Sequence, residues 1–220
     1  TMLEACRVVG SVEQIVVASS DKAYGASDDL PYREDTPLRP TAIYDASKAA
    51  ADMIARSYGV TYGLPIAVTR CGNLFGPGDL AWNRLIPGTI RSICRGEEPI
   101  LRSDGSPRRD YLYVKDAVAA YLALAEAISG ETKVVPGCPF NISPGQPRSV
   151  AQVMIEIAHA FDMSLKLKAP KESPRGEIQD QFLDSTKFRE LTGWSPRWTF
   201  EAAMAETAAW YREYLKEVPV

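Results

Sequence analysis

The stretch Ile-Val-Val-Ala-Ser-Ser-Asp-Lys-Ala-Tyr-Gly, residues 15–25, decides the fold of this 220-residue chain. Its first three residues are apolar and β-branched, and they are soon followed by Ser19, Ser20, Asp21 and Lys22. An apolar run that ends in a polar cluster is typical of a buried parallel strand, which presents functional groups at its carboxyl end. The sequence therefore predicts an α/β protein with a functional site at the end of this strand.

A second polar motif follows about twenty residues later. Tyr44 and Lys48 stand four residues apart in a segment, residues 42–56, with helical spacing. Side chains at positions i and i+4 share a helix face, and an ammonium beside a phenol favours the phenolate, which lowers the phenol's pKa from about 10. A tyrosine made basic in this way can take a proton from an alcohol, so the motif suggests carbinol oxidation.

Composition argues against two classes of protein. The net charge of −3 is not that of a nucleic-acid-binding protein, whose electrostatic footprint is basic. The chain has no run of 18 apolar residues, so we expect no membrane span.

The cysteines indicate neither a metal site nor a disulfide framework. Cys6, Cys71, Cys94 and Cys138 are widely scattered and lack the spacing of metal ligands. We expect no metal, and we read the cysteines as reduced thiols of a cytoplasmic protein.

The periodicity of apolar residues predicts the remaining elements. We expect strands at residues 13–19, 64–71, 100–101, 111–114, 140–142 and 165–167, and helices at 2–9, 41–58, 84–95, 116–129, 149–161 and 200–215. Residues 28–40 and 73–83 are predicted loops because they are rich in Pro, Gly or acidic residues.

Six motifs occur in a fixed order along the chain. They are Ser19-Ser20-x-x-x-Tyr24-Gly25, Tyr44-x-x-x-Lys48, Arg70-x-x-Asn73-x-x-Gly76-Pro77-Gly78, Gly105-x-x-x-Arg109-Asp110-Tyr111-x-Tyr113-Val114-x-Asp116, Asp184-Ser185-x-Lys187 and Gly193-Trp194-x-Pro196. In this order they resemble the extended short-chain dehydrogenase/reductase family of NAD-dependent nucleotide-sugar epimerases and dehydratases. The resemblance runs through nearly the whole chain.

This resemblance implies the fold and the domain organisation. It implies a Rossmann-like, doubly wound parallel sheet, represented by its C-terminal part, with a smaller α/β lobe for the substrate. Residues 1–73 would belong to the NAD-binding Rossmann domain, and residues 74–220 to the nucleotide-sugar lobe, with segments near 110–142 returning to the sheet. The family also implies a homodimer.

One family feature is missing from the sequence. The cofactor pyrophosphate should sit at a Gly-x-x-Gly-x-x-Gly turn before a helix, and no such series of glycines occurs here. By the family pattern, on the order of a hundred residues, half a Rossmann domain, are expected upstream of Thr1. We therefore expect residues 1–220 alone to be inactive. The family implies NAD rather than NADP.

The resemblance also assigns catalytic roles. Tyr44 would be the base, Lys48 would tune it and bind the cofactor ribose, and Ser20 would hydrogen-bond the same substrate oxygen. Ser19 is a further expected cofactor contact. We expect Tyr44, Lys48, Ser20 and Asp21 to face a common cleft.

Asp21 and Lys22 bear on the subclass of reaction. Simple 4-epimerases similar to this chain carry small or neutral residues at these positions, whereas 4,6-dehydratases carry an acid, usually as Asp-Glu. The Asp-Lys pair resembles that of CDP-glucose 4,6-dehydratases and of some UDP-N-acetylglucosamine 4,6-dehydratases. The sequence thus favours a nucleotide-sugar 4,6-dehydratase. A 4-epimerase or reductase, a catalytically incomplete binding module, and an exposed Asp-Lys ion pair without a catalytic role remain alternatives.

Other polar residues match places where the family holds the nucleotide diphosphate. They are Asn73, Asn83, Arg84, Arg109 and Arg175, and the resemblance makes Glu177 an expected ribose contact. Arginine suits phosphate because it forms bidentate, charge-assisted hydrogen bonds. A solvated arginine pair at Arg108-Arg109 is the alternative, and Arg175 stands one place later than the family pattern. Asp116 is expected to cap a helix, and Trp194 to pack the C-terminal lobe.

Overall fold

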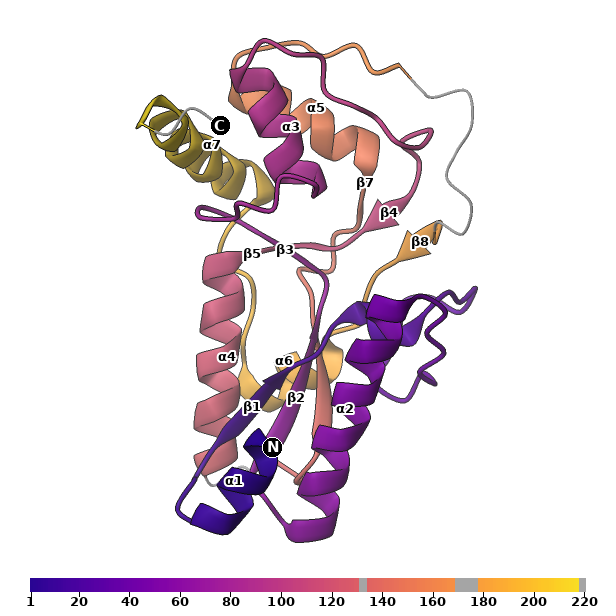
Figure 1. The fold of residues 1–220 in the computed structure, drawn as a ribbon, viewed down its shortest axis with the longest axis vertical. Coiled ribbons are helices and arrows are strands. Elements are labelled where there is room, and N and C mark those ends of the chain that lie inside the picture. Colours follow the sequence, from indigo (N-terminus) through magenta and orange to yellow (C-terminus); the bar gives the residue numbers. More distant parts are fainter. Residues whose placement is uncertain (131–133, 169–177, 218–220) are drawn as a thin grey trace.

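The computed structural model describes residues 1–130, 134–168 and 178–217. A three-stranded parallel sheet and its helices form one half of the molecule, and a second, mainly helical lobe forms the other (Figure 1). The two halves are linked by strands β3 (Asn73–Phe75) and β5 (Tyr111–Tyr113), which pair in parallel with each other.

The central sheet has the order β1-β2-β6, with β1 at Ile15–Ala18, β2 at Ile66–Cys71 and β6 at Cys138–Ile142. In its register Val17 pairs with Val68, and Thr69 pairs with Phe140. Every residue of the middle strand β2 is buried, as expected of a strand with neighbours on both edges. The predicted α/β fold with a parallel sheet is therefore confirmed.

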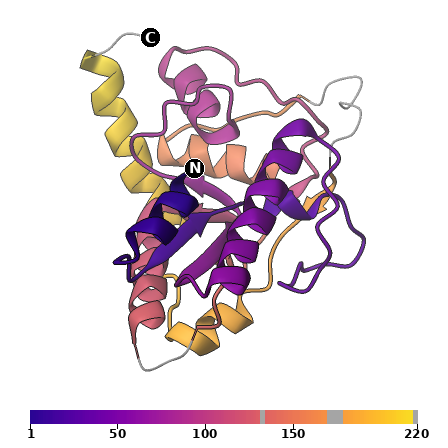
Figure 2. The same cartoon turned by 60° about the horizontal axis from the view of Figure 1, so that its bottom comes forward.

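Alternation along the strands assigns helices to the two faces of the sheet. Val17 and Val68 point toward α1 (Met2–Val9) and α2 (Ile43–Tyr62), where they pack with Leu3 and Ala55. Figures 1 and 2 both show α1 and α2 on this side of the sheet.

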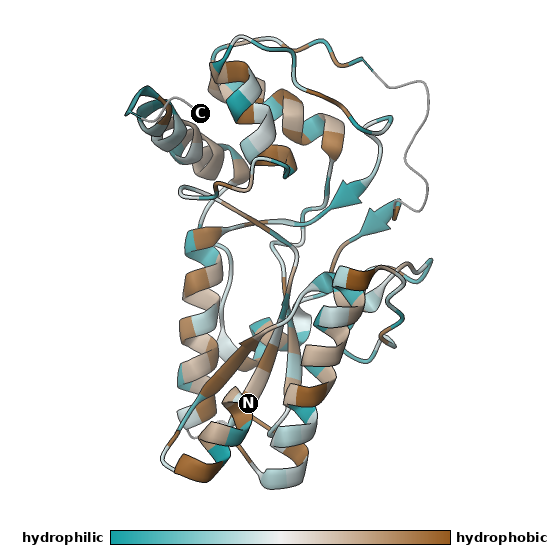
Figure 3. Ribbon diagram, viewed as in Figure 1, coloured by the Kyte–Doolittle hydropathy of each residue, from teal (hydrophilic) through white to brown (hydrophobic). Residues whose placement is uncertain are grey.

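On the opposite face, Val16 and Ala67 pack in one cluster with residues of α4 (Val114–Ser129) and α6 (Thr186–Thr192). The colouring by hydropathy shows β1 as a mainly apolar strand (Figure 3). The core of this half is thus a sheet between two layers of helices.

The second lobe is built from α3 (Leu85–Cys94), α5 (Val150–Ala160) and α7 (Phe200–Glu217). These helices pack around Phe75, Tyr111 and Tyr113 from the linking strands. Ser149 caps α5 as predicted, and it forms a capping box with Gln152.

A small mixed sheet lies beside the carboxyl end of β1. Its order is β7 (Arg148–Ser149), β4 (Arg108–Arg109) and β8 (Asp180–Gln181). The 3₁₀ helix η1 (Asp21–Tyr24) follows β1, and β8 is one of the elements that contact it through side chains.

Several expected elements differ from the structure. Residues 100–101 and 165–167 are both described and form no strand, and the expected loop at 73–83 begins with β3. Helix α4 begins at Val114, two residues before its predicted start. Among the described residues, no helix is both long and apolar enough to cross a bilayer.

Candidate functional site

Ser20 fixes the start of η1 at the carboxyl end of β1. Its Oγ accepts a hydrogen bond from the backbone nitrogen of Lys22 at 3.2 Å, which makes Ser20 the N-cap of η1. Its hydroxyl donates to Asp21 Oδ1 at 3.1 Å. The serine at the strand end thereby holds the next two residues in place.

Asp21 is almost completely buried, with 2% of its surface exposed. Within the described part of the chain, its Oδ2 atom has no hydrogen-bond partner. Burial raises the pKa of Asp21 to about 6, although the ammonium of Lys22 and the hydroxyl of Ser20 act in the opposite direction. A carboxyl group with this pKa can donate a proton near neutral pH.

Gln181 bridges the two residues after Ser20. The ammonium of Lys22 donates to Gln181 Oε1, and Gln181 Nε2 donates to the carbonyl of Asp21 at 3.1 Å. Gln181 is fully buried and lies on β8, about 160 residues away along the chain. No local sequence signal connects it to η1, so sequence reasoning missed it.

Tyr44 and Lys48 lie on the first two turns of α2. The Lys48 ammonium lies 5.9 Å from the centre of the Tyr44 ring, so the two side chains share a helix face as their spacing predicts. Tyr44 is 58% exposed. The hydroxyl of Ser19 donates to the Lys48 carbonyl at 3.5 Å, which connects the end of β1 with the helix.

A buried ion pair ties α2 to the middle strand. Arg70 Nε and Nη2 donate to the two oxygens of Asp52, each at 2.8 Å. Arg70 Nη1 donates to the hydroxyl of Tyr24 at 2.9 Å, and that hydroxyl donates to Asn141 Oδ1 at 2.7 Å. This network joins α2, β2, β6 and η1, and the sequence motifs alone did not indicate it.

The common cleft expected for Tyr44, Lys48, Ser20 and Asp21 stays a prediction, and the four side chains differ in exposure. Tyr44 is exposed, and Ser20 and Lys48 are half-buried. Asp21 is buried, because η1 folds back against Gln181 and α2. The Asp21 side chain is therefore almost completely shielded from solvent.

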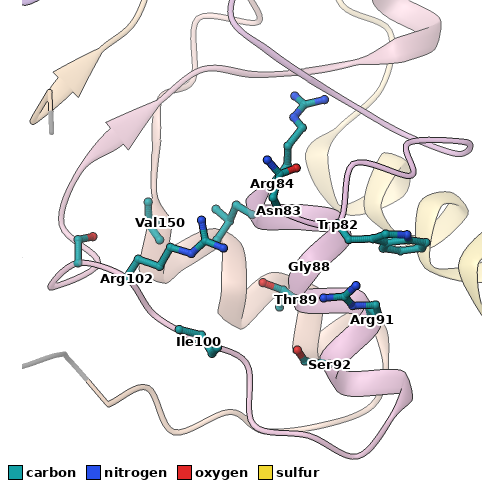
Figure 4. Close-up of a pocket in the computed structure, with 12 residues that line it drawn as sticks. Trp82, Asn83, Arg84, Gly88, Thr89, Arg91, Ser92, Ile100, Arg102 and Val150 are labelled. Carbon is teal, nitrogen blue, oxygen red and sulfur yellow. The ribbon is translucent and has the colours of Figure 1, made fainter. Parts of the chain in front are cut away.

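Asn83 and Arg84 line a pocket of about 250 Å³ at the start of α3, together with Trp82, Arg91 and Arg102 (Figure 4). Arg84 is held there by hydrogen bonds to Asp79 Oδ2 at 2.7 Å and to the carbonyl of Leu74 at 2.8 Å. Arg102 reaches across the pocket toward the start of α3. Sequence reasoning missed Arg102, whose position resembles no family motif.

Asn73 and Arg109 do not line this pocket, but Asn73 lines an adjoining one of about 180 Å³ that also includes Arg84 and Leu85. Asn73 begins β3, where its backbone nitrogen donates to the carbonyl of Asp110 at 2.9 Å. The guanidinium of Arg109 is buried and donates to the carbonyls of Arg108, Gln179 and Ile178. Arg175 and Glu177 lie outside the described residues.

Two residues expected to be structural, Asp116 and Trp194, contact each other at the N-terminal end of α4. The Trp194 Nε1 atom donates to the carbonyl of Asp116 at 3.2 Å. Trp194 is buried, but it packs in the cluster of the central sheet, α4 and α6, and not in the C-terminal lobe where it was expected. The carboxylate of Asp116 does not cap its own helix. It instead accepts from the backbone nitrogens of Arg197 at 2.9 Å and Trp198 at 3.3 Å, which anchors the C-terminal segment.

Cys6, Cys71, Cys94 and Cys138 are free thiols. In the part of the chain that the structure describes, no group of three or more His, Cys, Asp or Glu side chains could hold a metal ion.

A family profile, curated sequences and solved structures similar to this chain all belong to epimerases or dehydratases. The profile described as "NAD dependent epimerase/dehydratase family" matches residues 1–142. A trifunctional UDP-glucose 4,6-dehydratase/UDP-4-keto-6-deoxy-D-glucose 3,5-epimerase/UDP-4-keto-L-rhamnose-reductase of Arabidopsis thaliana is 35% identical over 217 residues. That alignment covers 96% of this chain and 31% of the Arabidopsis protein.

Solved structures of both a dehydratase and an epimerase superpose on the chain. The dTDP-glucose 4,6-dehydratase of Bacillus anthracis in complex with NAD gives a TM-score of 0.83 at 29% identity, covering 98% of this chain and 66% of that one. The UDP-glucose 4-epimerase of Thermotoga maritima with UDP-glucose gives a TM-score of 0.85 at 26% identity, with coverages of 97% and 68%. The chain thus spans about a third of the Arabidopsis protein and about two thirds of these two enzymes.

Proposed function

The chain belongs to the NAD-dependent epimerase/dehydratase family, and from that premise we propose that it carries the catalytic residues of a nucleotide-sugar 4,6-dehydratase. One observation supports this subclass above all. Asp21 and Lys22, a carboxyl group and an amine, follow the end of β1 in a helix η1 that packs against the helix of Tyr44 and Lys48. An acid and a base beside an oxidising centre are the groups that elimination of water requires.

The first chemical step is oxidation of the sugar at C4. The Tyr44 oxygen takes the proton of the C4 hydroxyl, the ammonium of Lys48 stabilises the phenolate, and Ser20 hydrogen-bonds the same substrate oxygen. A bound NAD would supply the hydride acceptor for oxidation at C4 and the hydride donor for C6. The 4-keto group that results acidifies the proton on C5.

The second step is loss of water across C5 and C6. Asp21 protonates the departing C6 hydroxyl, and the neutral amine of Lys22 takes the C5 proton. This assignment of the acid is supported by the pKa of Asp21, which burial raises to about 6. One proton leaves Asp21 and one arrives at Lys22, so the elimination is balanced.

The residues at the start of α2 fit the nicotinamide riboside end of NAD. Tyr44 is exposed and Lys48 half-buried, so both can contact a ligand, and Ser19 is hydrogen-bonded to the backbone of Lys48. We assign residues 1–73 to the NAD-binding part. Residues 74–220 would form the nucleotide-sugar lobe, with segments near 110–142 in the sheet.

The pocket at the start of α3 is the proposed site of the nucleoside diphosphate. Arg84 and Arg102 supply positive charge for phosphate, and Trp82 supplies an aromatic surface. Asn73, which lines an adjoining pocket with Arg84, would contact the same diphosphate. Arg109 would reach a phosphate only after its guanidinium leaves the carbonyls of Gln179 and Ile178. Arg175 and Glu177 remain proposed contacts from the sequence alone.

A 4-epimerase is the second candidate, and the burial of Asp21 favours it. Epimerisation at C4 needs Tyr44 and the cofactor but no acid at C6. A carboxyl group with 2% of its surface exposed must move, or be uncovered, before it can touch a sugar. Dehydration therefore requires that the Asp21 carboxyl group become accessible, which epimerisation does not.

Product mass distinguishes the two reactions. The natural protein in its full length is incubated with NAD and, separately, with CDP-glucose, dTDP-glucose, GDP-mannose and UDP-N-acetylglucosamine. Loss of one water from a substrate supports the dehydratase. A product of unchanged mass with inverted C4 assigns the chain to the epimerases, and no product with any substrate contradicts both.

Two further proposals concern assembly and location. A homodimer is supported by exposed apolar side chains on the outer face of α2, namely Met53, Ile54 and Val60, and light scattering of the purified protein tests it. A cytoplasmic location is supported by the free thiols, and cell fractionation tests it.

A further inference from the structure

We infer that Gln181 is a positioning residue that orients the amine of Lys22 for removal of the C5 proton. The inference rests on the proposed dehydratase function, because only that reaction uses Lys22 as a base. Gln181 itself does not touch the reacting atoms in this assignment. It would act through the hydrogen bond that it accepts from Lys22.

The orientation of the Gln181 side-chain amide is fixed by its two partners. A lysine ammonium can only donate, and the carbonyl of Asp21 can only accept. The amide therefore has its oxygen toward Lys22 and its nitrogen toward Asp21, and the reverse orientation would lose both hydrogen bonds. Full burial of Gln181 makes that loss costly.

The backbone around Gln181 is also held. Gln181 pairs with Arg109 in the register of β8 with β4, and the neighbouring Asp180 accepts from Arg108 Nε at 3.1 Å. Arg109 Nη1 donates to the carbonyl of Gln179 at 2.9 Å. The amide oxygen of Gln181 is therefore a fixed point toward which the flexible lysine side chain is directed.

This geometry has a chemical consequence for Lys22. When the amine is neutral, one N–H group bonds to Gln181 and the lone pair must point away from that oxygen. The hydrogen bond thus removes rotational freedom before the reaction, which is the way positioning lowers a barrier. An uncharged amide also stabilises the ammonium less than a carboxylate does.

The charged and titratable groups near this cluster come from several elements. Asp21 lies beside Lys22 on η1, Arg109 comes from β4, and Asp110 and Tyr32 interact electrostatically with Asp21. All four remain when Gln181 alone is replaced. Differences between Gln181 variants therefore report on the two hydrogen bonds of its side-chain amide, to Lys22 and to the Asp21 carbonyl.

The test compares Gln181→Met, which removes both hydrogen bonds at similar volume, with Gln181→Glu, which offers a carboxylate to the ammonium. Gln179→Met is the matched control, because Gln179 lies on the same segment with an exposed side chain. We expect Gln181→Met to lower kcat for dehydration by about tenfold to a hundredfold with KM changed less than about threefold. Formation of NADH in single-turnover absorbance measurements should stay near the wild-type rate, because C4 oxidation does not use Lys22.

A second readout does not depend on turnover. Lysines are labelled by reductive ¹³C-methylation, the Lys22 signal is identified with Lys22→Arg, and its titration is followed by NMR. A carboxylate favours the charged amine, so Gln181→Glu should move the midpoint to higher pH by about one unit, and Gln181→Met should move it to lower pH.

The outcomes separate this inference from the proposed function. Opposite displacements in the two variants support the role of Gln181, and equal displacements, or none, overturn it. If Gln181→Glu does not fold, a midpoint in Gln181→Met equal to that of the wild type overturns it equally. A wild-type protein that dehydrates no sugar contradicts the proposed function, whatever the titration shows.

Discussion

Arg70 on β2 and Asp52 on α2 form a buried bidentate ion pair, with two hydrogen bonds of 2.8 Å and side chains exposed by only 1% and 0%. Asp52 stands four residues after Lys48 and eight after Tyr44, so the three residues lie on neighbouring turns of one helix face. The ion pair therefore fixes the rotation of α2 that determines where Tyr44 and Lys48 point.

Replacing Arg70 with Met should destabilise the protein by about 3–5 kcal/mol, because it leaves the Asp52 carboxylate buried without its partner. Arg56→Met is the control, since Arg56 is 40% exposed and approaches Asp52 only to 3.9 Å. Its removal should cost less than about 1 kcal/mol. Urea unfolding measures both. Equal effects of the two substitutions would mean that the ion pair does not hold α2.

Tyr44→Phe should reduce turnover by at least about a hundredfold while nucleotide-sugar binding persists, because only the ionisable oxygen is lost. Tyr62→Phe, at the end of the same helix, should leave turnover within about twofold of the wild type. Steady-state kinetics on the full-length protein measures both variants. Near-normal turnover of Tyr44→Phe would remove Tyr44 from the role of base.

Gly25→Ala should destabilise the protein severely. Gly25 has φ +74°, and a Cβ atom there would lie 2.1 Å from the Arg39 carbonyl oxygen. Gly63 has φ +66° and nothing within 4 Å of its Cβ position. Gly63→Ala should therefore lower the free energy of unfolding only by the cost of a left-handed backbone conformation, about 1–2 kcal/mol. Thermal unfolding separates the two. Similar melting temperatures of Gly25→Ala and Gly63→Ala would show that the backbone at Arg39 moves away from the new Cβ atom without loss of stability.

The stability of the protein should depend on pH through Asp110, whose pKa burial raises from 3.8 to about 6. The folded protein binds this proton more tightly than the unfolded chain does. The contribution of Asp110 to stability is therefore full below about pH 4 and is lost as the pH rises through about 6.

Asp110→Asn removes this titration and can still accept the hydrogen bond from the Leu183 nitrogen. Relative to the wild type, the variant should gain roughly 2–3 kcal/mol of unfolding free energy between about pH 4 and pH 7. The exposed Asp35→Asn is the control and should show no such trend. Urea unfolding at several pH values measures the free energy of unfolding of both proteins. If that free energy has the same pH dependence in the wild type and in Asp110→Asn, the prediction is contradicted.

Arg102→Gln should weaken binding of the nucleoside diphosphate by about tenfold or more, since a charge-assisted hydrogen bond contributes roughly 1.5–3 kcal/mol. Arg95→Gln is the control, because Arg95 follows α3 outside the pocket and approaches Glu97 at 3.8 Å. Calorimetry with UDP, dTDP, CDP and GDP measures the affinities. Unchanged affinity in Arg102→Gln would place the diphosphate elsewhere.

The local elements were predictable because short-range physics determines them. The β-branched run Ile15-Val16-Val17 predicts a strand, which forms at Ile15–Ala18, although its residues are half-buried or exposed and not buried as expected. Ser149 predicts the start of α5 through its side-chain oxygen. Tyr44 and Lys48 share a face because both lie on one regular helix. The spacing of residues within an element is enough for such inferences.

The sequence by itself thus determined the α/β class, the central strands and the pair Tyr44 and Lys48. Only the tertiary structure decided that Asp21 is buried, that Gln181 holds Lys22, and that Arg70 fixes α2 through Asp52. These contacts join residues 18 to 160 positions apart, and their formation depends on how β8, α2 and β2 pack together. Periodicity within one segment carries no information about which distant polar group will meet it. Burial favours a hydrogen-bond partner for each polar atom, and Gln181 and Arg70 have theirs, although the Asp21 Oδ2 atom has none among the described residues.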